Sequence, residues 1–411
     1  MVCVKYDVAV IGAGPAGATA AKFLSQSGLK VVLIEKENLP RDKPCGGALS
    51  LQHLKRFKYL GGKRRGLIGG CPSYGVKVYS PSLETVAEYT YSEPQVRLVL
   101  RKEFDQVLVD LALDSGTELR NNTVKDVIVT PNAAKIAVDD GQVIESQLVV
   151  GADGANSVVG KKTGLNPAWK KWQVTICAVN EVQVGENVVD EYVGSQRPLH
   201  IFSFNDFFGY GWLFPKREHL NVGIGGPLSL TKNIYNMFVR QVRILKDLEL
   251  IPKDFPNSRF KARFAPVSGI IKKPYGDRVV LCGDAAGCSN PLNGEGIYYA
   301  MASGQIASET ILRALENGDV NSRGLSGYRT RLMEDFGYDH EISLNLQRQA
   351  MNTWPLMENA VRLARADKYL LMKAIDHGLG KISTSQFLLE SGARLPISCL
   401  KYAMQGLDCK R

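Results

Sequence analysis

Apolar and small residues alternate at the start of the chain in a pattern that predicts a strand, a helix and a second strand. Residues 6–12 (YDVAVIG) form a nearly continuous apolar run, which is typical of a parallel strand buried on both faces. Residues 15–27 are rich in alanine and end at Gly28, a residue that commonly terminates helices. Residues 30–36 (KVVLIEK) are the second apolar run. The pattern therefore predicts a β-α-β unit.

Two later segments show the same order of elements, a strand followed by a glycine-containing loop. Residues 148–160 (LVVGADGANSVVG) indicate a strand that runs into a loop. Residues 277–297 (DRVVLCGDAAGCSNPLNGEGI) indicate a strand, a glycine-rich turn and the start of a long helix. Before the first of these two segments, residues 97–112 have apolar positions at helical spacing, and a further strand is expected around Val124.

The middle of the chain changes to short alternating segments. Residues 174–184, 187–194, 199–204, 209–215 and 220–226 are separated by turn residues, which predicts an antiparallel sheet, and residues 71–89 indicate further strands of the same layer. In GYGWLFP (209–215) the aromatic residues Tyr210, Trp212 and Phe214 occupy every second position, so a strand would place them on one face. The opposite face would be nearly bare.

These elements predict an α/β chain in three parts. The first is a nucleotide-binding domain made of residues 1–70, 96–165 and 265–325. The second is an antiparallel-sheet domain made of residues 71–95 and 166–264. Residues 326–411 form a helical C-terminal region, because their apolar positions recur at three-to-four spacing. We expect these helices to close an apolar tunnel or rest on a bilayer surface, or else simply to complete the core.

The first loop has the chemistry of a dinucleotide site. Gly12 allows a tight turn, Gly14 lets the backbone approach a pyrophosphate, and Gly17 lets the helix pack closely on the strand. The phosphates would lie at the positive N-terminus of the helix, and Glu35 would accept hydrogen bonds from ribose hydroxyls. Because strand, helix, second strand and terminal acid are all in place, the GxGxxG pattern predicts dinucleotide binding.

Charge and cysteine spacing exclude several other classes. The net charge is +10, but the basic residues are scattered in short clusters without a nucleic-acid-binding pattern, so we expect no nucleic-acid partner. The charge suits anionic membrane surfaces or phosphorylated substrates, or simply a solvated surface. Eight dispersed cysteines lack CxxC spacing, so no metal site is expected. With no signal peptide and no apolar run of about 18–20 residues, we expect a cytoplasmic protein that at most lies against the inner membrane face.

The three glycine-containing segments, in this order, resemble the flavoprotein hydroxylase superfamily, in which FAD is held by GxGxxG, DG and GD motifs. The resemblance implies a Rossmann-type FAD domain of the hydroxylase-like flavoprotein fold. It implies that FAD contacts Gly12, Gly14, Ala16, Gly17, Glu35, Arg101, Val124, Asp153, Gly283, Asp284, Gly294, Gly296 and Ile297.

In that superfamily the GD aspartate, here Asp284, binds the ribityl chain; the alternative is that it caps a helix. Gly294, Gly296 and Ile297 would open a helix that faces the flavin pyrimidine edge. A helix dipole of about +0.5 charge would stabilise reduced flavin there.

The segment KPCGGAL (43–49), together with GYGWLFPK (209–216), resembles the geranylgeranyl reductase family, whose members carry a cysteine–glycine loop and a YxWxFP motif. In that family the cysteine lies beside the flavin ring. The resemblance therefore implies FAD contacts for Cys45, Gly46, Gly47 and Ala48, and a substrate-binding role for Tyr210, Trp212 and Phe214. Bare glycine backbone can lie against the isoalloxazine.

The same resemblance implies an FAD-dependent reduction of C=C bonds in geranylgeranyl chains of lipids or prenyl diphosphates. An isolated alkene needs a proton on one carbon while flavin N5 gives hydride to the other. A thiol is protonated at neutral pH, so Cys45 is the candidate catalytic residue; the alternative is that it only packs beside the ring. The sequence leaves open whether Cys45 pairs with Cys288. It also leaves open whether ferredoxin, a deazaflavin or NAD(P)H is the electron donor.

Three alternative functions use the same scaffold. An aromatic monooxygenase would need access for oxygen, and a flavin or lipid carrier would need no reactive loop. A halogenase would carry WxWxIP, whereas this chain has tyrosine and phenylalanine at two of those positions. The reductase is therefore the function that the residues favour.

Overall fold

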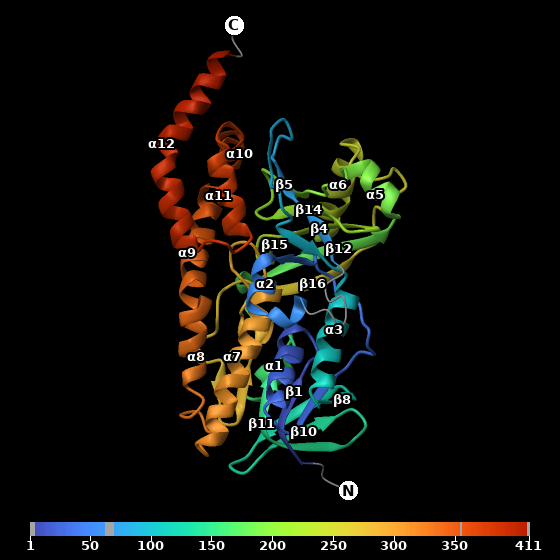
Figure 1. The fold of residues 1–411 in the computed structure, drawn as a ribbon, viewed down its shortest axis with the longest axis vertical. Helices are drawn as coiled ribbons and strands as arrows, with labels where there is room; N and C mark the ends of the chain where they lie inside the picture. Colours follow the sequence, from blue (N-terminus) through green and yellow to red (C-terminus); the bar gives the residue numbers. More distant parts are fainter. Residues whose placement is uncertain (1–4, 62–69, 354–355, 409–411) are drawn as a thin grey trace. The chain divides into compact units, whose positions relative to one another are not determined.

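The computed structural model describes residues 5–61, 70–353 and 356–408 (Figure 1). The chain divides into two compact units, each built from three segments of the sequence. The first unit comprises Met1–Lys43, Arg101–Val174 and Ala265–Leu344, and the second comprises Pro44–Leu100, Thr175–Phe264 and Asn345–Arg411. The domain bounds expected from the sequence remain predictions.

The sheet of the first unit has eight strands. Its main path is β17-β18-β11-β1-β2-β8, and β10 and β9 extend from β11. The strands are β1 (Lys5–Ile11), β2 (Val31–Glu35), β8 (Glu118–Asn121), β9 (Val124–Val129), β10 (Ala134–Val138), β11 (Val143–Gly151), β17 (Tyr275–Gly276) and β18 (Val279–Leu281). The five strands from β18 to β8 are parallel, so the loops after β1, β11 and β18 leave from one edge.

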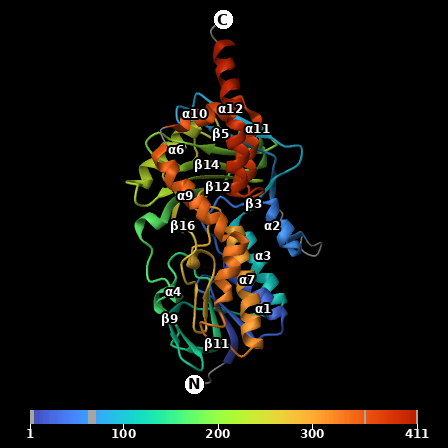
Figure 2. The ribbon, with the colours of Figure 1, turned by 90° about the vertical axis from the view of Figure 1, so that its left-hand side faces the viewer.

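Helices of the first unit pack beside this sheet. They are α1 (Pro15–Gln26), α3 (Arg101–Asp114), α4 (Val158–Lys162), α7 (Ile297–Glu316), α8 (Gly327–Leu332), the π-helical turn η4 (Met333–Gly337) and the start of α9 (Tyr338–Thr353), with 3₁₀ turns η2 (Lys171–Gln173) and η3 (Gly283–Ala286). α1 contacts both α3 and α7 (Figure 2). The approach of α7 is close because Gly304 has no side chain to meet the carbonyl oxygen of Ala16.

The second unit contains two sheets. The larger has the order β16-β12-β15-β14-β13-β5-β6 and the smaller has the order β3-β7-β4. The strands are β3 (Ala48–Ser50), β4 (Cys71–Ser73), β5 (Gly75–Tyr79), β6 (Val86–Thr90), β7 (Val96–Leu98), β12 (Val174–Gln183), β13 (Leu199–Phe202), β14 (Tyr210–Pro215), β15 (His219–Pro227) and β16 (Lys261–Pro266). Strands β12, β15, β14 and β13 pair antiparallel, as the alternation predicts, whereas β13 and β5 are parallel.

Helices of the second unit fall into two groups. The first comprises α2 (Leu51–Arg56), the 3₁₀ turn η1 (Lys58–Gly61), α5 (Glu186–Val193) and α6 (Ile234–Asp247). The second comprises α10 (Met357–Ala366), α11 (Lys368–Gly378) and α12 (Thr384–Asp408), which pack against one another, with α10 and α11 also on β6. The α/β class and the helical C-terminal region expected from the sequence are confirmed.

Two expected elements differ from the structure. The segment 187–194, expected as a strand, is helical up to Val193 in α5, with Gly194 as the C-cap; that prediction is wrong. The β-branched residues suggested a strand, but Val189 and Val193 lie four positions apart and pack on the core, and glycines at positive φ bound both ends of the helix. The helix expected over residues 97–112 begins at Arg101, because residues 96–98 form β7.

Among the described residues, no helix is both long and apolar enough to cross a bilayer. Within the same residues, no group of three or more His, Cys, Asp or Glu side chains is arranged to hold a metal ion.

Candidate functional site

The turn between β1 and α1 requires glycine at two positions. Gly12 has φ +99°, and a Cβ there would lie 2.5 Å from the carbonyl oxygen of Ala152. A Cβ on Gly17 would collide with the carbonyl oxygen of Gly12. The turn is therefore packed tightly against the loop that follows β11.

The N-terminus of α1 has the features of an anion-binding helix end. Gly14 is the N-cap and Pro15 follows it, no side chain caps the helix, and the first turn contains no acidic residue. The first amides of a helix have no partner within it and carry partial positive charge. The nearest atom to a Cβ built on Gly14 is Nη2 of Arg41, 3.7 Å away. A phosphate placed here would meet both backbone amides and a guanidinium.

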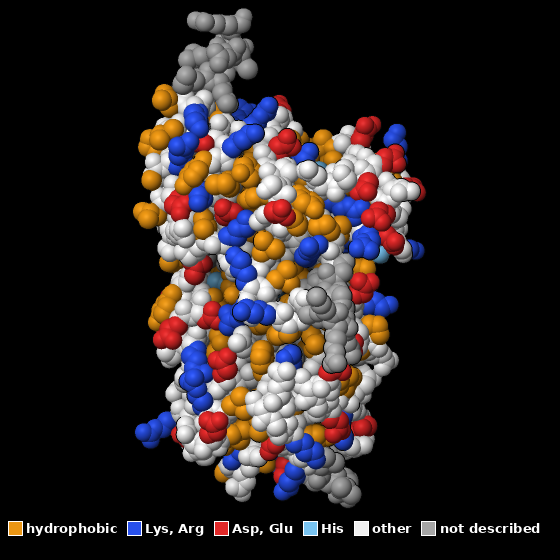
Figure 3. Space-filling model, viewed as in Figure 1, with side chains coloured by type: hydrophobic (Ala, Val, Ile, Leu, Met, Phe, Trp, Pro, Cys, Tyr) orange, Lys and Arg blue, Asp and Glu red, His pale blue; other side chains and the backbone are white. Residues whose placement is uncertain are grey.

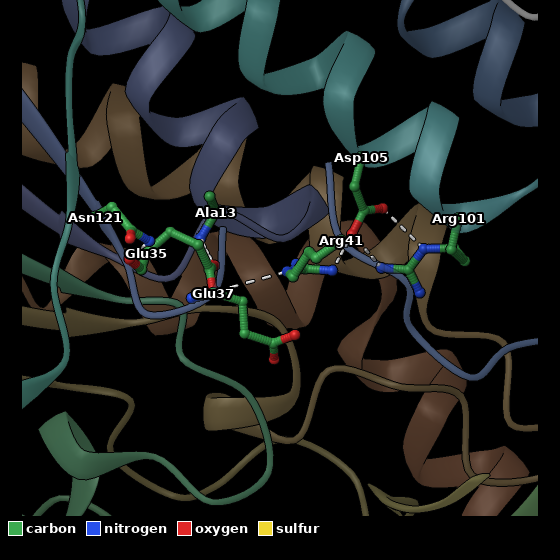
Figure 4. Close-up of polar contacts among 7 residues, drawn as sticks. All are labelled: Ala13, Glu35, Glu37, Arg41, Arg101, Asp105 and Asn121. Carbon is green, nitrogen blue, oxygen red and sulfur yellow. Dashed lines mark hydrogen bonds and ion pairs between the residues drawn. The ribbon is translucent and has the colours of Figure 1, made fainter. Parts of the chain in front are cut away.

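Glu35, at the end of β2, is hydrogen-bonded to the same glycine turn (Figure 4). Its Oε2 accepts a hydrogen bond from the N–H of Ala13 at 2.8 Å, and its Oε1 accepts one from the N–H of Glu37 at 3.1 Å. The side-chain amide of Asn121 donates to the carbonyl oxygen of Glu35 at 3.0 Å. A carboxylate has further lone pairs, so Glu35 can still accept from a ribose hydroxyl.

Arg41 connects this turn to α3 (Figure 4). Its Nε lies 3.7 Å from Oε1 of Glu35, and its Nη1 donates to Asp105 at 2.9 Å. Arg101 donates two further hydrogen bonds to Asp105, both at 2.8 Å. Burial on its own would raise the pKa of the Asp105 carboxyl, but the guanidinium of Arg101, followed by that of Arg41, lowers it below its usual range. The result is a buried, ionised triad beside the glycine turn.

Sequence reasoning missed two members of this triad. Asp105 lies four residues after Arg101 on a helix, and that spacing of opposite charges was a usable signal. No local pattern singles out Arg41, because its partners lie in other segments of the chain.

The loop after β11 is organised by Asp153. Its carboxylate accepts hydrogen bonds from Oγ of Ser157 at 2.5 Å and from the N–H groups of Val158 and Val159 at 2.7 and 3.1 Å. These bonds fix the start of α4. The expected contact between Asp153 and the cofactor stays a prediction.

The loop after β18 reaches the same region of the first unit. A Cβ on Gly283 would lie 3.1 Å from Cβ of Ala16. Asp284 accepts a hydrogen bond from Ser289 at 3.0 Å. It lies inside η3, whose N-cap is Cys282, so the alternative of an N-cap role is wrong. α7 begins at Ile297, as expected, and no side chain caps it.

Glu295 immediately precedes the N-cap of α7 and is a further residue that sequence reasoning missed. Its side chain is half-buried, and burial raises the pKa of its carboxyl to about 7. An acid between two glycines at the start of a helix was visible in the sequence as GEG. A carboxyl that holds its proton near neutral pH places no full negative charge at this helix end.

The first unit therefore brings three glycine loops together. Gly12 contacts the loop of Ala152, and Ala16 contacts Gly283. The predicted residues of this unit are Gly12, Gly14, Ala16, Gly17, Glu35, Arg101, Val124, Asp153, Gly283, Asp284, Gly294, Gly296 and Ile297. Cys288 is fully buried here, and burial raises the pKa of its thiol. Both Cys45 and Cys288 are free thiols.

The predicted residues 45–48 belong to the second unit, so their place beside a cofactor stays a prediction. Contacts within the second unit explain why this loop has glycine at both positions. A Cβ on Gly46 would lie 2.7 Å from the ring of Phe214. Gly47 has φ +73°, and a Cβ there would collide with the carbonyl oxygen of Val99. The loop thus needs both glycines in order to lie where it does.

A hydrogen-bonded chain ties the Cys45 loop to β14. The carbonyl oxygen of Cys45 accepts from Nδ2 of Asn221 at 2.9 Å, and Oδ1 of Asn221 accepts from Nε1 of Trp212 at 2.8 Å. Asn221 is fully buried on β15. Within the described residues, the hydrogen bond of the Cys45 sulfur is a local one, accepted from the N–H of Gly47 at 3.4 Å. No sequence signal pointed to Asn221.

The three aromatic residues of β14 lie on one face, as predicted. Ring centroids are 5.7 Å apart for Tyr210 and Trp212, and 6.1 Å apart for Trp212 and Phe214. Trp212 is buried over Gly223, whose missing Cβ leaves room for the indole, whereas Tyr210 and Phe214 are half-buried. On the opposite face, expected to be bare, Gly211 packs against Gln241 of α6. That face is the core side of the sheet.

An ion pair with a buried lysine lies next to the Cys45 loop. Lys216, which ends the GYGWLFPK segment, has a side chain only 2% exposed and pairs with Glu181 at 2.5 Å. Its Nζ is 3.0 Å from the point where a Cβ of Gly47 would stand. The ion pair therefore packs directly against the backbone of the Cys45 loop at Gly47.

Comparison with known proteins gives matches over most of the chain. A family model described as an FAD binding domain matches residues 5–333. The chain is 31% identical to digeranylgeranylglycerophospholipid reductase of Methanothrix thermoacetophila, across 90% of this chain and 91% of that protein. It is 33% identical to the protein of the same name from Methanosarcina mazei, across 83% of each.

Solved structures give the same fold. A geranylgeranyl bacteriochlorophyll reductase-like protein from Thermoplasma acidophilum has a TM-score of 0.78 and 24% identity, with 89% of this chain and 93% of that chain covered. A flavin-dependent brominase has a TM-score of 0.70 and 21% identity, with 99% of this chain and 100% of that chain covered. At these identities the likeness establishes the fold, which is the hydroxylase-like fold expected from the sequence.

Proposed function

This chain belongs to the digeranylgeranylglycerophospholipid reductase family, and from that membership we propose that it is an FAD-dependent reductase that saturates C=C bonds of geranylgeranyl chains. The substrates would be membrane lipids or prenyl diphosphates that carry such chains. The observation that carries the proposal is the identity of 31–33% to named reductases over most of each chain. The FAD part of the proposal is supported by the uncapped amides at the start of α1 near Gly14, which we call the anion cradle, and by the buried charges of Glu35, Arg41 and Asp105 beside them.

FAD is the dinucleotide, and the residues of the first unit fit it. The cradle at Gly14 is bordered by uncapped amides of α1 and by Arg41, both of which suit a pyrophosphate. Glu35 retains lone pairs for a ribose hydroxyl. The uncapped start of α7 would receive the pyrimidine edge, where a helix N-terminus favours negative charge.

Reduced FAD supplies a hydride when bound, so the chain has to supply the position of the alkene and a proton. We propose that the thiol of Cys45 holds this proton and gives it to the second carbon of the double bond. The anchoring of its carbonyl by Asn221 supports this role, because it limits the positions that the thiol can occupy.

The isoprenoid chain requires an apolar surface. We propose that Tyr210 and Phe214 provide it, since both are half-buried on the face of β14 that carries the Cys45 loop. Trp212 is buried and hydrogen-bonded to Asn221, so it would act on substrate through the loop that it helps to anchor.

The electron donor is proposed to be external. We assign the one GxGxxG pattern in the sequence to FAD, so ferredoxin, a deazaflavin or transiently bound NAD(P)H would reduce the flavin. A lipid substrate also implies that the chain works at a membrane surface.

The function is tested by product mass. Purified, dithionite-reduced protein should add about two mass units per double bond to a geranylgeranyl glycerophospholipid. Absence of any gain on lipids and on geranylgeranyl diphosphate would contradict the proposal. An oxygen-dependent gain of about sixteen mass units would indicate a monooxygenase instead.

The role of Cys45 is tested separately with Cys45→Ser. The variant should bind FAD with the affinity of the wild type, because the hydrogen bond that the structure shows for the sulfur is a local one, from the N–H of Gly47. Its turnover should fall by about 10² or more if the thiol transfers the proton. Turnover equal to that of the wild type would leave Cys45 as a packing residue.

A further inference from the structure

Helix α12 presents an uncharged surface to its surroundings. Between Ser385 and Tyr402, every exposed residue is uncharged. Among the charged residues of this stretch the most exposed side chain is that of Lys401, at 43%, and it pairs with Asp367. The large apolar side chains among the exposed residues are Leu388, Leu389, Leu395, Ile397, Leu400 and Tyr402, with exposed fractions between 39% and 75%. At about 100° per residue these positions cover more than half of the helix circumference. We refer to this surface as the α12 face.

The charged side chains of α12 that the structure describes, Glu390, Arg394 and Lys401, pair with α11 and with its N-cap residue. Arg394 and Lys401 both pair with Asp367, at 2.8 and 3.2 Å. Ser398 donates to the same carboxylate at 2.7 Å. Glu390 pairs with Lys373 of α11 at 2.7 Å. The side of α12 that meets the protein is therefore its polar side.

This arrangement is the reverse of an ordinary surface helix. A helix packed on a soluble core buries its apolar stripe and exposes its charges. Isolated exposed leucines are common, but a contiguous apolar surface marks a place where another apolar body binds. Figure 3 shows apolar side chains along the edge of the molecule where Figure 1 draws α12, with Lys and Arg side chains beside them.

The charge of the surrounding residues indicates which kind of apolar partner would bind the α12 face. Residues 345–411 contain ten lysines and arginines and five acidic residues, so this stretch carries half of the net charge of +10. An apolar helix face within a basic region is complementary to a bilayer with anionic headgroups. A second copy of the chain would bring the same positive charge, and repulsion would oppose that contact.

We propose that the α12 face is a membrane-docking surface that inserts into the interface of a bilayer containing anionic lipids. α12 would lie along the surface, since its polar side stays paired with α11. The inference extends the proposed function, because a reductase of lipid chains must reach them, but vesicle binding can be measured without any turnover.

The test measures binding to vesicles. Full-length protein is mixed with vesicles of phosphatidylglycerol and phosphatidylcholine, or of phosphatidylcholine alone, and bound protein is separated by flotation. The wild type should bind the anionic vesicles, more weakly as salt rises. Leu389→Glu combined with Leu400→Glu should reduce the partition coefficient by about tenfold or more.

A matched control is available in the same unit. Leu230 is 51% exposed and lies outside α12. Leu230→Glu makes the same chemical change and should bind vesicles as the wild type does. Circular dichroism and bound FAD report whether each variant has folded.

A second variant covers the case in which the double substitution does not fold. Leu400→Trp keeps the face apolar, and its added fluorescence should be quenched by vesicles of brominated lipid. Absence of added quenching would contradict insertion of α12.

Two other outcomes would overturn the proposal. One is a wild type that does not bind anionic vesicles, even if the protein reduces detergent-solubilised lipid. The other is a dimer in light scattering that the double variant converts to a monomer while vesicle binding is unchanged; the α12 face would then bind a second copy. Vesicle binding without product formation would leave this inference standing and contradict the proposed function alone.

Discussion

At Asn221 a single side-chain amide makes two different hydrogen bonds, one as donor and one as acceptor. It accepts from the indole of Trp212 and donates to the carbonyl of Cys45, and it is fully buried. An ionised carboxylate of the same shape can accept but cannot donate. The position of the Cys45 loop therefore depends on the chemistry of one nitrogen atom.

Asn221→Asp should destabilise the chain by about 1–3 kcal/mol, because the carbonyl of Cys45 loses its donor in a buried site. Urea unfolding measures this change. Asn359→Asp, the same substitution at an exposed position, should alter the unfolding free energy by less than about 0.5 kcal/mol. Equal effects at the two sites would mean that the hydrogen bonds of Asn221 add nothing to the unfolding free energy.

Glu295 makes stability depend on pH near neutrality. Burial raises the pKa of its carboxyl to about 7, above the ordinary value of 4.5, so the folded chain holds a proton that the unfolded chain has lost. The stability that this proton contributes should therefore be lost as pH rises from about 4.5 to about 7, so the unfolding free energy of the wild type should fall relative to that of Glu295→Gln over this range. Unfolding free energies of both proteins across pH 5–8 test it; parallel curves would contradict the raised pKa.

At the scale of elements, the contact between α1 and α7 depends on small residues. Gly304 of α7 faces the carbonyl oxygen of Ala16 and the backbone of Ala20. The same α1 carries the glycine turn at its start, and α7 begins beside Glu295. The spacing of these two helices thus sets the separation of two parts of the proposed cofactor site in the first unit.

Gly304→Ala should lower the unfolding free energy by about 1–3 kcal/mol, since the new Cβ would overlap the backbone of α1. Gly327→Ala is the matched control. Gly327 is also helical, but a Cβ there would meet no atom within 4 Å, so stability should stay equal or rise by up to about 1 kcal/mol. Similar losses at both positions would show that helix packing is not the cause.

At the scale of the whole molecule, binding of FAD should be visible as added stability. A ligand that binds only the folded chain at a hundred times its dissociation constant adds about 2.7 kcal/mol. Thermal unfolding with FAD should therefore shift upward. Riboflavin, which lacks the pyrophosphate, should shift the midpoint far less, because it cannot use the cradle at Gly14.

Arg41→Ala should weaken FAD binding by roughly tenfold to a hundredfold, the loss of a charge-assisted contact. Arg120→Ala removes an arginine of the same unit that pairs locally with Glu118, and it should leave FAD affinity unchanged. Flavin fluorescence titration measures both. An unchanged affinity in Arg41→Ala would place the pyrophosphate elsewhere.

The sequence predicted those parts of the fold that depend on local pattern. The β-α-β unit, four of the five alternating segments and the start of α7 follow from periodicity and glycine position, and the structure confirms them. Helix α5 was misassigned because its β-branched residues match strand preferences, while tertiary packing of Val189 decides in favour of a helix.

Site residues whose partners are distant in the sequence could not be predicted in this way. Arg41 contacts Asp105 across 64 positions, and Asn221 contacts Cys45 across 176. Such pairs are set by the topology of the sheets, and no window of neighbouring residues contains both members. Family resemblance supplied Arg101 and Cys45, but not the residues that hold them.

The side chain of Asn221 holds Cys45 through its backbone carbonyl, whereas the hydrogen bond that the structure shows for the sulfur stays within its own loop, at the N–H of Gly47. Heritable changes at this position can therefore alter reactivity without dismantling the scaffold around it. Over evolutionary time, such a loop can exchange one chemistry for another while the neighbouring glycines and the asparagine are retained.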